Sequence, residues 1–532
     1  MLPANGGFFT ESEAILMVRR GTRIGTFLVF TVFLFFWRAP FQSEGAIRYV
    51  TRNGAGTRHG SSWVNAMGEK EFIGTLRLHV QAGTEFWIAA GTYRPTSDPG
   101  ERGASFTLQA GVALYGGFTG KEVLRTQRDW KTNETILSGE IQNDGYWPNN
   151  SLHVVSAGKE ADGTAVIDGF TVTGGWAYGS LVEEYSGGGL ANYGSPAVSN
   201  CTFRENGAKN GGGMYTSGSG SLVTGCTFEG NRAGEGGGMY NVLGSGLSVK
   251  NSFFSGNQAD SGGGMYNYYT LGLTVENCSF SGNYSENYGG GMMNSESNPS
   301  ITGCTFSGNR AGIAGGGMSS LGVGTPVTAN SGGDSSPAVL NCTFFANEAG
   351  TAGGGMHVRF CSIAVASCTF HKNLSNLVGG DMANLDYSSP AIKNSIFWGS
   401  SIGSIHTHPT ASAMVKYCVV QGGYAGGTSI ITADPKLADL SDNGGRTFTC
   451  ALLAGSSAID AGTSSGAPPA DQRGVSRPQG AGVDIGAFEF SLAPPPPTPS
   501  PSPSSGGGCS QAGSVPSLIL LLLLPVLLLM RP

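Results

Sequence analysis

The chain has 532 residues, of which only 12% are charged and 88 are glycine. A net charge of −6 and a pI near 5.7, without a basic run in the body of the chain, argue against nucleic acid as a partner. The abundant glycine and the lack of any long stretch with helical periodicity indicate a turn-rich, all-β protein.

The first 46 residues have the order of a secretory signal region. Arg19, Arg20 and Arg23 precede an apolar run, Ile24–Trp37, that is too short to span a membrane comfortably. Met17 stands just before these arginines and is the start of translation that we favour; a longer positive region is the alternative. We therefore expect the protein to be exported.

Residues 47–160 are expected to form an N-terminal cap and the first coils of a repeat architecture. Through residues 161–430, a phrase of about 26 residues recurs. Each copy has a Cys-Thr-Phe run or a variant of it, an Asn three residues after the Phe, and then Gly-Gly-Gly-Met. One interval is 38 residues long where its neighbours are 26, and its extra residues lie within 323–337. They are predicted to form an inserted loop that leaves the next repeat undisturbed.

The repeat favours strands over helices, because three adjacent glycines would destabilise a helix by about 3 kcal/mol relative to alanine. By strand alternation, Cys201 and Phe203 point into a core and Thr202 points outward. The Asn and the glycine triplet are interpreted as two corners, the Asn because it tolerates a left-handed backbone. The predicted fold is all-β: a single-stranded right-handed parallel β-helix, a solenoid of the pectin-lyase-like type with caps at both ends.

Two residue files are expected to stack along the axis of this solenoid. The cysteines should pack as small hydrophobes instead of pairing in disulfides, since Ser252 replaces one of them. The asparagine amides should bond to one another from coil to coil. The cysteine file consists of Cys201, Cys226, Cys278, Cys304, Cys342 and Cys368, and the asparagine file consists of Asn206, Asn231, Asn257, Asn283, Asn309, Asn347 and Asn373.

Residues 431–490 are rich in Asp and are predicted to form a C-terminal cap. No cofactor is expected except a structural Ca²⁺, for which Asp460, Asp471 and Asp484 are candidate ligands. Turn-forming Asp residues and surface ion pairs are the alternative explanation.

A Pro/Ser/Gly linker follows at 491–508, and an apolar segment at 509–532 could contact a membrane. The Gly-Gly-Gly-Cys-Ser entry to this segment resembles the C-terminal sorting signals of bacterial surface proteins, of the Synergistes type and the Cys-bearing myxobacterial type. The resemblance implies processing at or near Cys509 and a location at the bacterial cell surface or outer membrane, or outside the cell. A plain membrane anchor is the alternative.

Three further resemblances cover most of the chain between the two ends. The Phe-x-x-Asn and Gly-Gly-Gly-Met runs resemble the repeats of polymorphic outer membrane proteins, with Gly-Met in place of the usual Ala-Ile. That family implies an adhesin-like surface role. Segments from Gly60–Trp63 to Ile136–Glu140 resemble the first coils of bacterial secreted parallel β-helix proteins. Five segments near the C-terminus resemble a choice-of-anchor Q domain: Asp434-Pro435, Asp442–Arg446, Ser456–Gly462, Asp471–Gly474 and Asp484–Glu489.

No catalytic residue is predicted, because the carboxylates of the repeats fall at different repeat positions. Tyr215, Tyr240 and Tyr266 follow the Met of three successive repeats and are expected to form an outward-facing, glycan-binding platform. The sequence thus predicts a surface-anchored, non-catalytic protein that contacts glycans or the surfaces of host or neighbouring cells. The alternatives are a polysaccharide-degrading lyase or hydrolase and a purely structural surface component.

Overall fold

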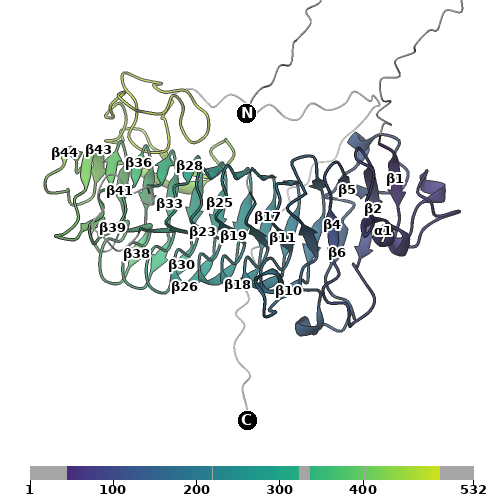
Figure 1. Cartoon of the computed structure of the whole chain (residues 1–532). Helices are drawn as coiled ribbons and strands as arrows, with labels where there is room; N and C mark the ends of the chain where they lie inside the picture. The colour runs from purple at the N-terminus through teal and green to yellow at the C-terminus, as the bar shows by residue number, and fades with distance from the viewer. Residues whose placement is uncertain (1–44, 219, 323–335, 401, 492–532) are drawn as a thin grey trace, which may run out of the picture. The chain divides into compact units, whose positions relative to one another are not determined.

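The computed structural model describes residues 45–218, 220–322, 336–400 and 402–491. Within them, strands stack along one axis into parallel sheets of 25, 11 and 8 strands (Figure 1). One antiparallel pair follows, formed by β45 (Leu437–Ser441) and β46 (Thr449–Leu452). The longest helix in these ranges, α1 (Glu69–Leu76), has only eight residues. The protein is therefore all-β.

One coil shows how the chain builds the sheets. After β13 (Thr202–Arg204) the chain turns into β14 (Gly207–Asn210), then β15 (Met214–Thr216), then β16 (Leu222–Thr224). The next strand, β17 (Thr227–Glu229), pairs with β13 in parallel. Because each strand pairs with its equivalent one coil later, equivalent residues of successive coils stack along the axis. This arrangement is a right-handed parallel β-helix, as predicted.

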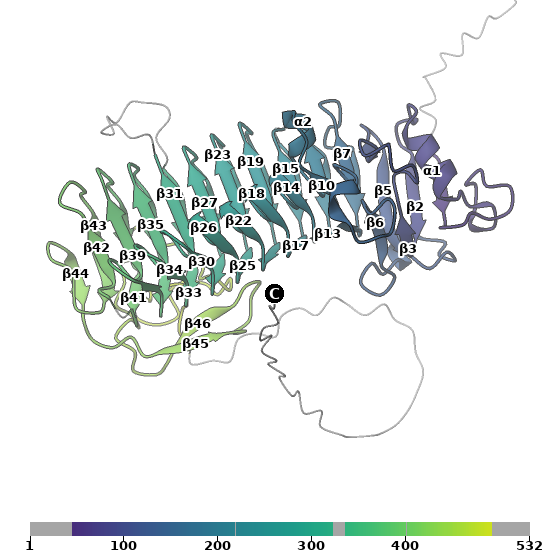
Figure 2. The same cartoon turned by 90° about the horizontal axis from the view of Figure 1, so that it is seen from below.

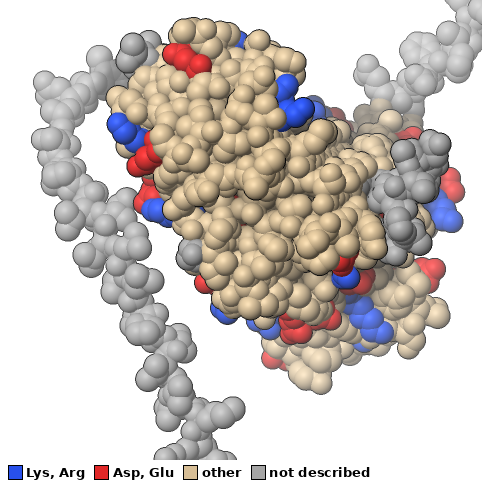
Figure 3. Space-filling view, turned by 90° about the vertical axis from the view of Figure 1, so that its left-hand side faces the viewer, with Lys and Arg blue, Asp and Glu red and all other residues tan. Residues whose placement is uncertain are grey.

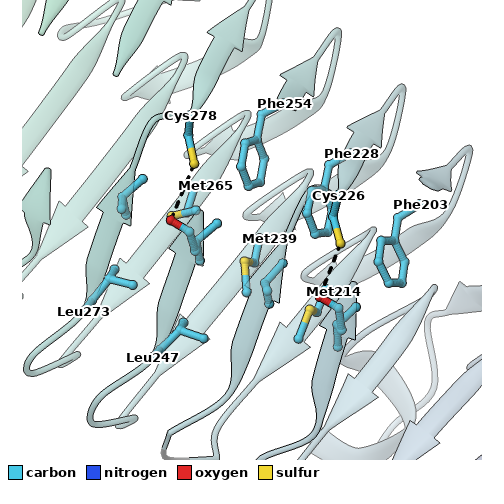
Figure 4. Packing of buried hydrophobic residues seen from close by; sticks show 14 of the residues in the cluster. Phe203, Met214, Cys226, Phe228, Met239, Leu247, Phe254, Met265, Leu273 and Cys278 are labelled. Atoms are coloured by element: carbon cyan, nitrogen blue, oxygen red, sulfur yellow. Dashed lines mark hydrogen bonds between the residues drawn. The ribbon is translucent and has the colours of Figure 1, made fainter. Parts of the chain in front are cut away.

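The inward-facing phenylalanines form one continuous stack, beside which the methionines form another (Figure 4). From Phe203 to Phe397, consecutive ring centroids lie 4.5 to 5.0 Å apart. Phe306 and Phe344, on either side of the long interval, are 4.7 Å apart, so the stack continues past the insertion. Each buried Phe contributes about 1.5 to 3 kcal/mol, which it gains only because the neighbouring coils cover it.

The six cysteines of the repeat line the same core as buried free thiols. Their sulfurs donate to backbone carbonyls of the preceding coil, as Cys226 does to Val198 O at 3.6 Å (Figure 4). Burial raises the pKa of the Cys201 thiol to about 12, so that it stays protonated. Ser252 occupies the same file and donates to Lys250 O at 2.8 Å. The position therefore accepts any small side chain that can donate one hydrogen bond.

The seven asparagines form a buried amide ladder. In the first six, Nδ2 donates to Oδ1 of the next Asn, at 2.9 to 3.1 Å. Gly175 N donates to Oδ1 of the first, Asn206, at 3.0 Å, and Nδ2 of the last, Asn373, donates to Asp381 Oδ1 at 2.9 Å. All the amides thus point the same way along the axis. A second buried amide file runs through Asn241, Asn267 and Asn294.

The predicted reason for this Asn file was wrong in one respect: these residues do not adopt the left-handed backbone. The residue before each Asn does so instead, as at Glu205 (φ 52°), Gly230 (φ 61°) and Lys372 (φ 57°). The corner leaves the following Asn free to point inward. Its role is to hydrogen-bond buried groups between coils, because unpaired polar groups are costly in a core.

The glycine triplet is required by close packing between coils. Gly211 has φ 66°, a conformation that favours glycine. A Cβ on Gly213 would lie 2.5 Å from Gly238 O of the next coil and 2.9 Å from the Phe228 ring. The same relation recurs at later coils, which explains why all three glycines repeat.

The N-terminal end of the core is covered by α1 (Figure 2). Phe72 and Leu76 are its buried residues, and the Phe72 ring packs against Phe86 and Phe106 at centroid distances of 5.3 and 6.0 Å. This helix therefore shields the first coils from solvent.

Residues 431–490 were expected to cap the C-terminal end, but much of this segment folds back along the side of the largest sheet (Figures 1 and 2). Thr447 Oγ1 donates to Gly303 O at 2.8 Å, and Asn341 Nδ2 donates to Ala470 O at 2.8 Å. Ala487 N donates to the hydroxyl of Thr369 at 3.0 Å. The segment reaches several coils toward the N-terminus, and it covers sheet positions that would otherwise face solvent.

Candidate functional site

The predicted tyrosine platform exists as a stack but is not open to solvent. Tyr215, Tyr240 and Tyr266 lie on β15, β19 (Met239–Val242) and β23 (Met265–Tyr268), directly opposite one another. Their ring centroids are 5.7 and 5.3 Å apart. However, their exposed fractions are only 6%, 6% and 9%. A glycan could not lie flat on rings that are covered to this extent, and the expectation of an exposed platform is corrected.

The covering comes from side chains that the repeat pattern does not mark. Tyr193, Tyr268 and Tyr288 pack against the stack as partly buried neighbours. Glu235 is hydrogen-bonded to Tyr240, and burial raises the pKa of this carboxyl. The cluster is a second, outer hydrophobic layer on the eleven-stranded sheet, and its first effect is to stabilise that sheet.

The proposed calcium ligands face hydrogen-bond donors instead of a common cation site. Asp471 accepts from the backbone N–H groups of Arg473, Val475 and Glu489. Asp460 Oδ1 accepts from Gly482 N at 2.9 Å, and Asp484 accepts from the N–H groups of Asp460 and Phe490. Over the described ranges, no group of three or more His, Cys, Asp or Glu is placed to hold a metal ion. These Asp side chains fasten the turns of the C-terminal segment, which is the turn-forming role in the alternative explanation.

A buried ion pair reinforces the same segment. Arg477 donates to Glu489 at 2.8 Å, and both side chains are almost fully buried. Arg477 also donates to the carbonyls of Asp484 and Gly486. Burial raises the pKa of Asp484 to about 6, which opposes the effect of its hydrogen bonds. The side chains of Arg477, Glu489 and Asp484 therefore all bond within this segment.

Charged groups on the outer face of the largest sheet are mostly paired. Toward the N-terminal end, Arg128 binds Asp168 at 2.8 Å and Arg204 binds Glu134 at 3.2 Å. Farther along, Lys250 binds Glu276 at 2.9 Å on the neighbouring coil. Pairing of opposite charges across adjacent strands is the favourable arrangement on a sheet.

Within the described residues, a groove near the C-terminal end of this sheet carries charged side chains that are not paired in this way. Its volume is about 520 Å³, and one side is formed by β36 (Ala364–Ala366), β40 (Ala391–Lys393) and β43 (Met414–Val420). Thr463 and Ser465 of the folded-back segment line the other side. Sequence reasoning missed this groove because its second side comes from residues about 70 positions later in the chain; the only available signal was a Lys at equivalent positions of two successive coils.

Asp381 is a further group that was not predicted. It replaces the third glycine of the last Gly-Gly-Gly-Met run, is fully buried, and accepts from Asn373 at the end of the amide ladder. Burial raises its pKa to about 7, against the opposing effect of the hydrogen bond from Asn373. The signal for Asp381 in the sequence was that it makes the single break in the repeated glycine triplet.

Several predicted features lie outside the described residues: the signal region up to residue 44, positions 323–335 of the insertion, the linker from residue 492, Cys509 and the tail. In the ranges that the structure covers, no helix is long and apolar enough to cross a membrane.

Comparisons with known proteins address the fold. The family model described as "Right handed beta helix region" matches residues 149–289 and, in an overlapping match, 189–351. A search of curated proteins found no match. Among solved structures, the pectate lyase Pel9A has a TM-score of 0.41 at 14% identity, covering 84% of this chain and 98% of the lyase. The Dettilon tailspike protein has a TM-score of 0.28 at 11% identity, covering 61% of this chain and 62% of the tailspike. The family-model match and the strand pairing agree that the repeat region is a right-handed parallel β-helix.

Proposed function

We propose that this chain is an exported protein, anchored at the bacterial cell surface, that binds glycans or neighbouring cell surfaces without catalysing a reaction. The order of features at its N-terminus supports export. Its resemblance to polymorphic outer membrane protein repeats, to a choice-of-anchor Q domain and to Cys-containing sorting tails supports surface display. The β-helix holds its outer faces in a fixed geometry, which suits repeated contacts with a long polymer.

One observation carries the non-catalytic part of this proposal: of the three described carboxyl groups whose pKa burial raises, two are inaccessible to a substrate, and the third, Glu235, is hydrogen-bonded to Tyr240. A general acid or base needs both a pKa near the working pH and access to the reacting bond. Asp381 is fully buried, and Asp484 is only 2% exposed and bonded to backbone N–H groups. On the outer face, Glu134, Asp168 and Glu276 are held in ion pairs.

A panel of acidic and neutral polysaccharides tests this function. We expect the full chain to retain at least one polysaccharide in affinity electrophoresis without producing new reducing or unsaturated ends. New ends would instead show a lyase or hydrolase, and the proposal would be wrong. Neither retention nor turnover would favour a purely structural surface component.

Export and anchoring are tested separately on cells that express the full gene. Mass spectrometry of the surface protein should find a processed N-terminus downstream of Thr26 and a C-terminus at or near Cys509. An intact N-terminus upstream of Thr26 on the mature protein would contradict export. An intact tail ending at Pro532 would indicate a plain anchor.

A further inference from the structure

Two lysines that line the groove described above lack a charge partner, although a lysine at the equivalent position of an earlier coil has one. Lys393 and Lys416 lie directly opposite each other on β40 and β43. In the described part of the chain, no carboxylate lies within 4.0 Å of either ammonium group, whereas Lys250, at the equivalent position of an earlier coil, binds Glu276 at 2.9 Å. Like charges facing each other across adjacent strands are unfavourable. The free protein therefore has an uncompensated positive site here.

The rest of the groove is neutral and suited to a sugar. Ala364, Ala391 and Met414 give it an apolar floor, with the small alanine side chains leaving the sheet surface open. Hydroxyl groups come from Tyr417, Thr428 and Thr463. A surface of this kind matches the apolar face and the hydroxyl rim of a pyranose ring. The end of the solenoid near this groove shows mostly uncharged surface, with charged side chains toward its margins (Figure 3).

The far side of the groove is held in place by internal bonds. Asn394 donates to Thr463 O at 2.8 Å and accepts from Thr463 N at 3.0 Å. Lys393 donates to Ser465 O, which leaves two of its three ammonium protons for a ligand. Lys416 is exposed at the groove, next to Thr428 on β44 (Thr428–Ile431). The ammonium group of Lys393 is thus positioned before any ligand arrives, which lowers the cost of ordering it on binding.

We infer that this groove binds a linear anionic polysaccharide, with Lys393 and Lys416 contacting the carboxylate or sulfate groups of neighbouring sugar residues. The inference deepens the proposed glycan-binding function and rests on it. Stacked strands along the solenoid present the two charges one rung apart, about 4.8 Å, so a polymer with an acidic group on each sugar can meet both.

Titration of the full chain with polygalacturonate, with dextran sulfate and with neutral dextran tests the inference. We expect binding of at least one anionic polymer, weakened by added salt, and no binding of neutral dextran at the groove. The double variant Lys393→Gln/Lys416→Gln should bind that polymer roughly tenfold or more weakly, because it removes two charge-assisted contacts. Comparing the two anionic polymers shows whether carboxylate or sulfate is the preferred group.

Lys250→Gln is the matched control, since it removes a lysine at the same ladder position where the charge is already paired. It should leave the affinity within about twofold, and thermal midpoints of all variants should agree, because none of these side chains is buried in the core. Wild-type affinity in the double variant, an equal loss in Lys250→Gln, or binding of neutral dextran alone would overturn the inference. Retention of neutral dextran alone, without turnover, would overturn it while leaving the proposed non-catalytic function intact, whereas turnover would contradict that function directly.

Discussion

Substitution of one Asn in the middle of the amide ladder should weaken the solenoid out of proportion to the atoms removed. In Asn283→Ala, Phe254 O and Asn309 Oδ1 each lose a donor at 2.9 Å. Asn257 loses the acceptor for its backbone N–H, at 3.1 Å, and one acceptor for its side chain, at 2.9 Å. A buried N–H without a partner costs about 1 to 3 kcal/mol and each of the three other lost bonds about 1 kcal/mol, so we expect a loss of about 4 to 6 kcal/mol.

The effect should be largely local, because each coil packs mainly against its neighbours, apart from the coils that the C-terminal segment also contacts. Hydrogen exchange measured by mass spectrometry should show faster exchange in the coils that contain residues 254–309, with little change in the first coils. Ser281→Ala, an exposed substitution in the same coil, is the control and should change stability by no more than about 0.5 kcal/mol. Unchanged exchange in Asn283→Ala, or an equal effect of both substitutions, would refute the view that the amide bonds between coils hold the stack together.

Three further predictions concern the core and the outer layer. Cys278→Ser should change the free energy of unfolding, measured by urea denaturation, by less than about 1 kcal/mol, because Ser252 already occupies this file with its hydroxyl bonded to a backbone carbonyl. A large loss would show that the thiol is specifically required. Asp381 has a folded pKa raised to about 7, so the native state binds more protons than the unfolded state between about pH 4 and 7, and its contribution to stability should fall as pH rises through that range. Asp381→Asn should remove this part of the pH dependence in denaturation curves, and an unchanged profile would contradict the assignment. Tyr240→Ala should lower stability by about 3 kcal/mol in thermal or chemical denaturation, as a buried aromatic does; an unaltered midpoint would restore the exposed-platform hypothesis.

At the corners, the Asn pattern correctly predicted a turn, but the conformation assigned to the Asn itself was wrong. The Asn three residues after each Phe could be predicted to mark a turn, and it does follow one. Whether that Asn or the residue before it takes the left-handed conformation depends on which side chain must reach the core. Glu205 and Lys372 take it despite their side chains, because the next position has to present an amide to the adjacent coil.

The tyrosine file and the lysine pair illustrate the limits of reasoning from repeats. Tyr215, Tyr240 and Tyr266 were correctly placed on one face of successive coils, but their exposure depends on side chains such as Tyr193 and Tyr268 that do not follow the phrase. Lys393 and Lys416 could be aligned by position, yet only the path of the C-terminal segment makes them part of a groove.

The solenoid follows from the repeat in the amino-acid sequence. A residue that recurs at a constant interval must pack against copies of itself, so the Phe, Cys, Asn and Gly files specify the strands, their parallel register and the core. Which outer faces are open to solvent depends instead on contacts between distant parts of the chain. Residues 431–490 return along the largest sheet through hydrogen bonds to Gly303, Asn341 and Thr369, contacts that join positions more than a hundred residues apart. Exposure depends on what covers a surface, and the covering segment here has no periodic relation to the coils that it covers.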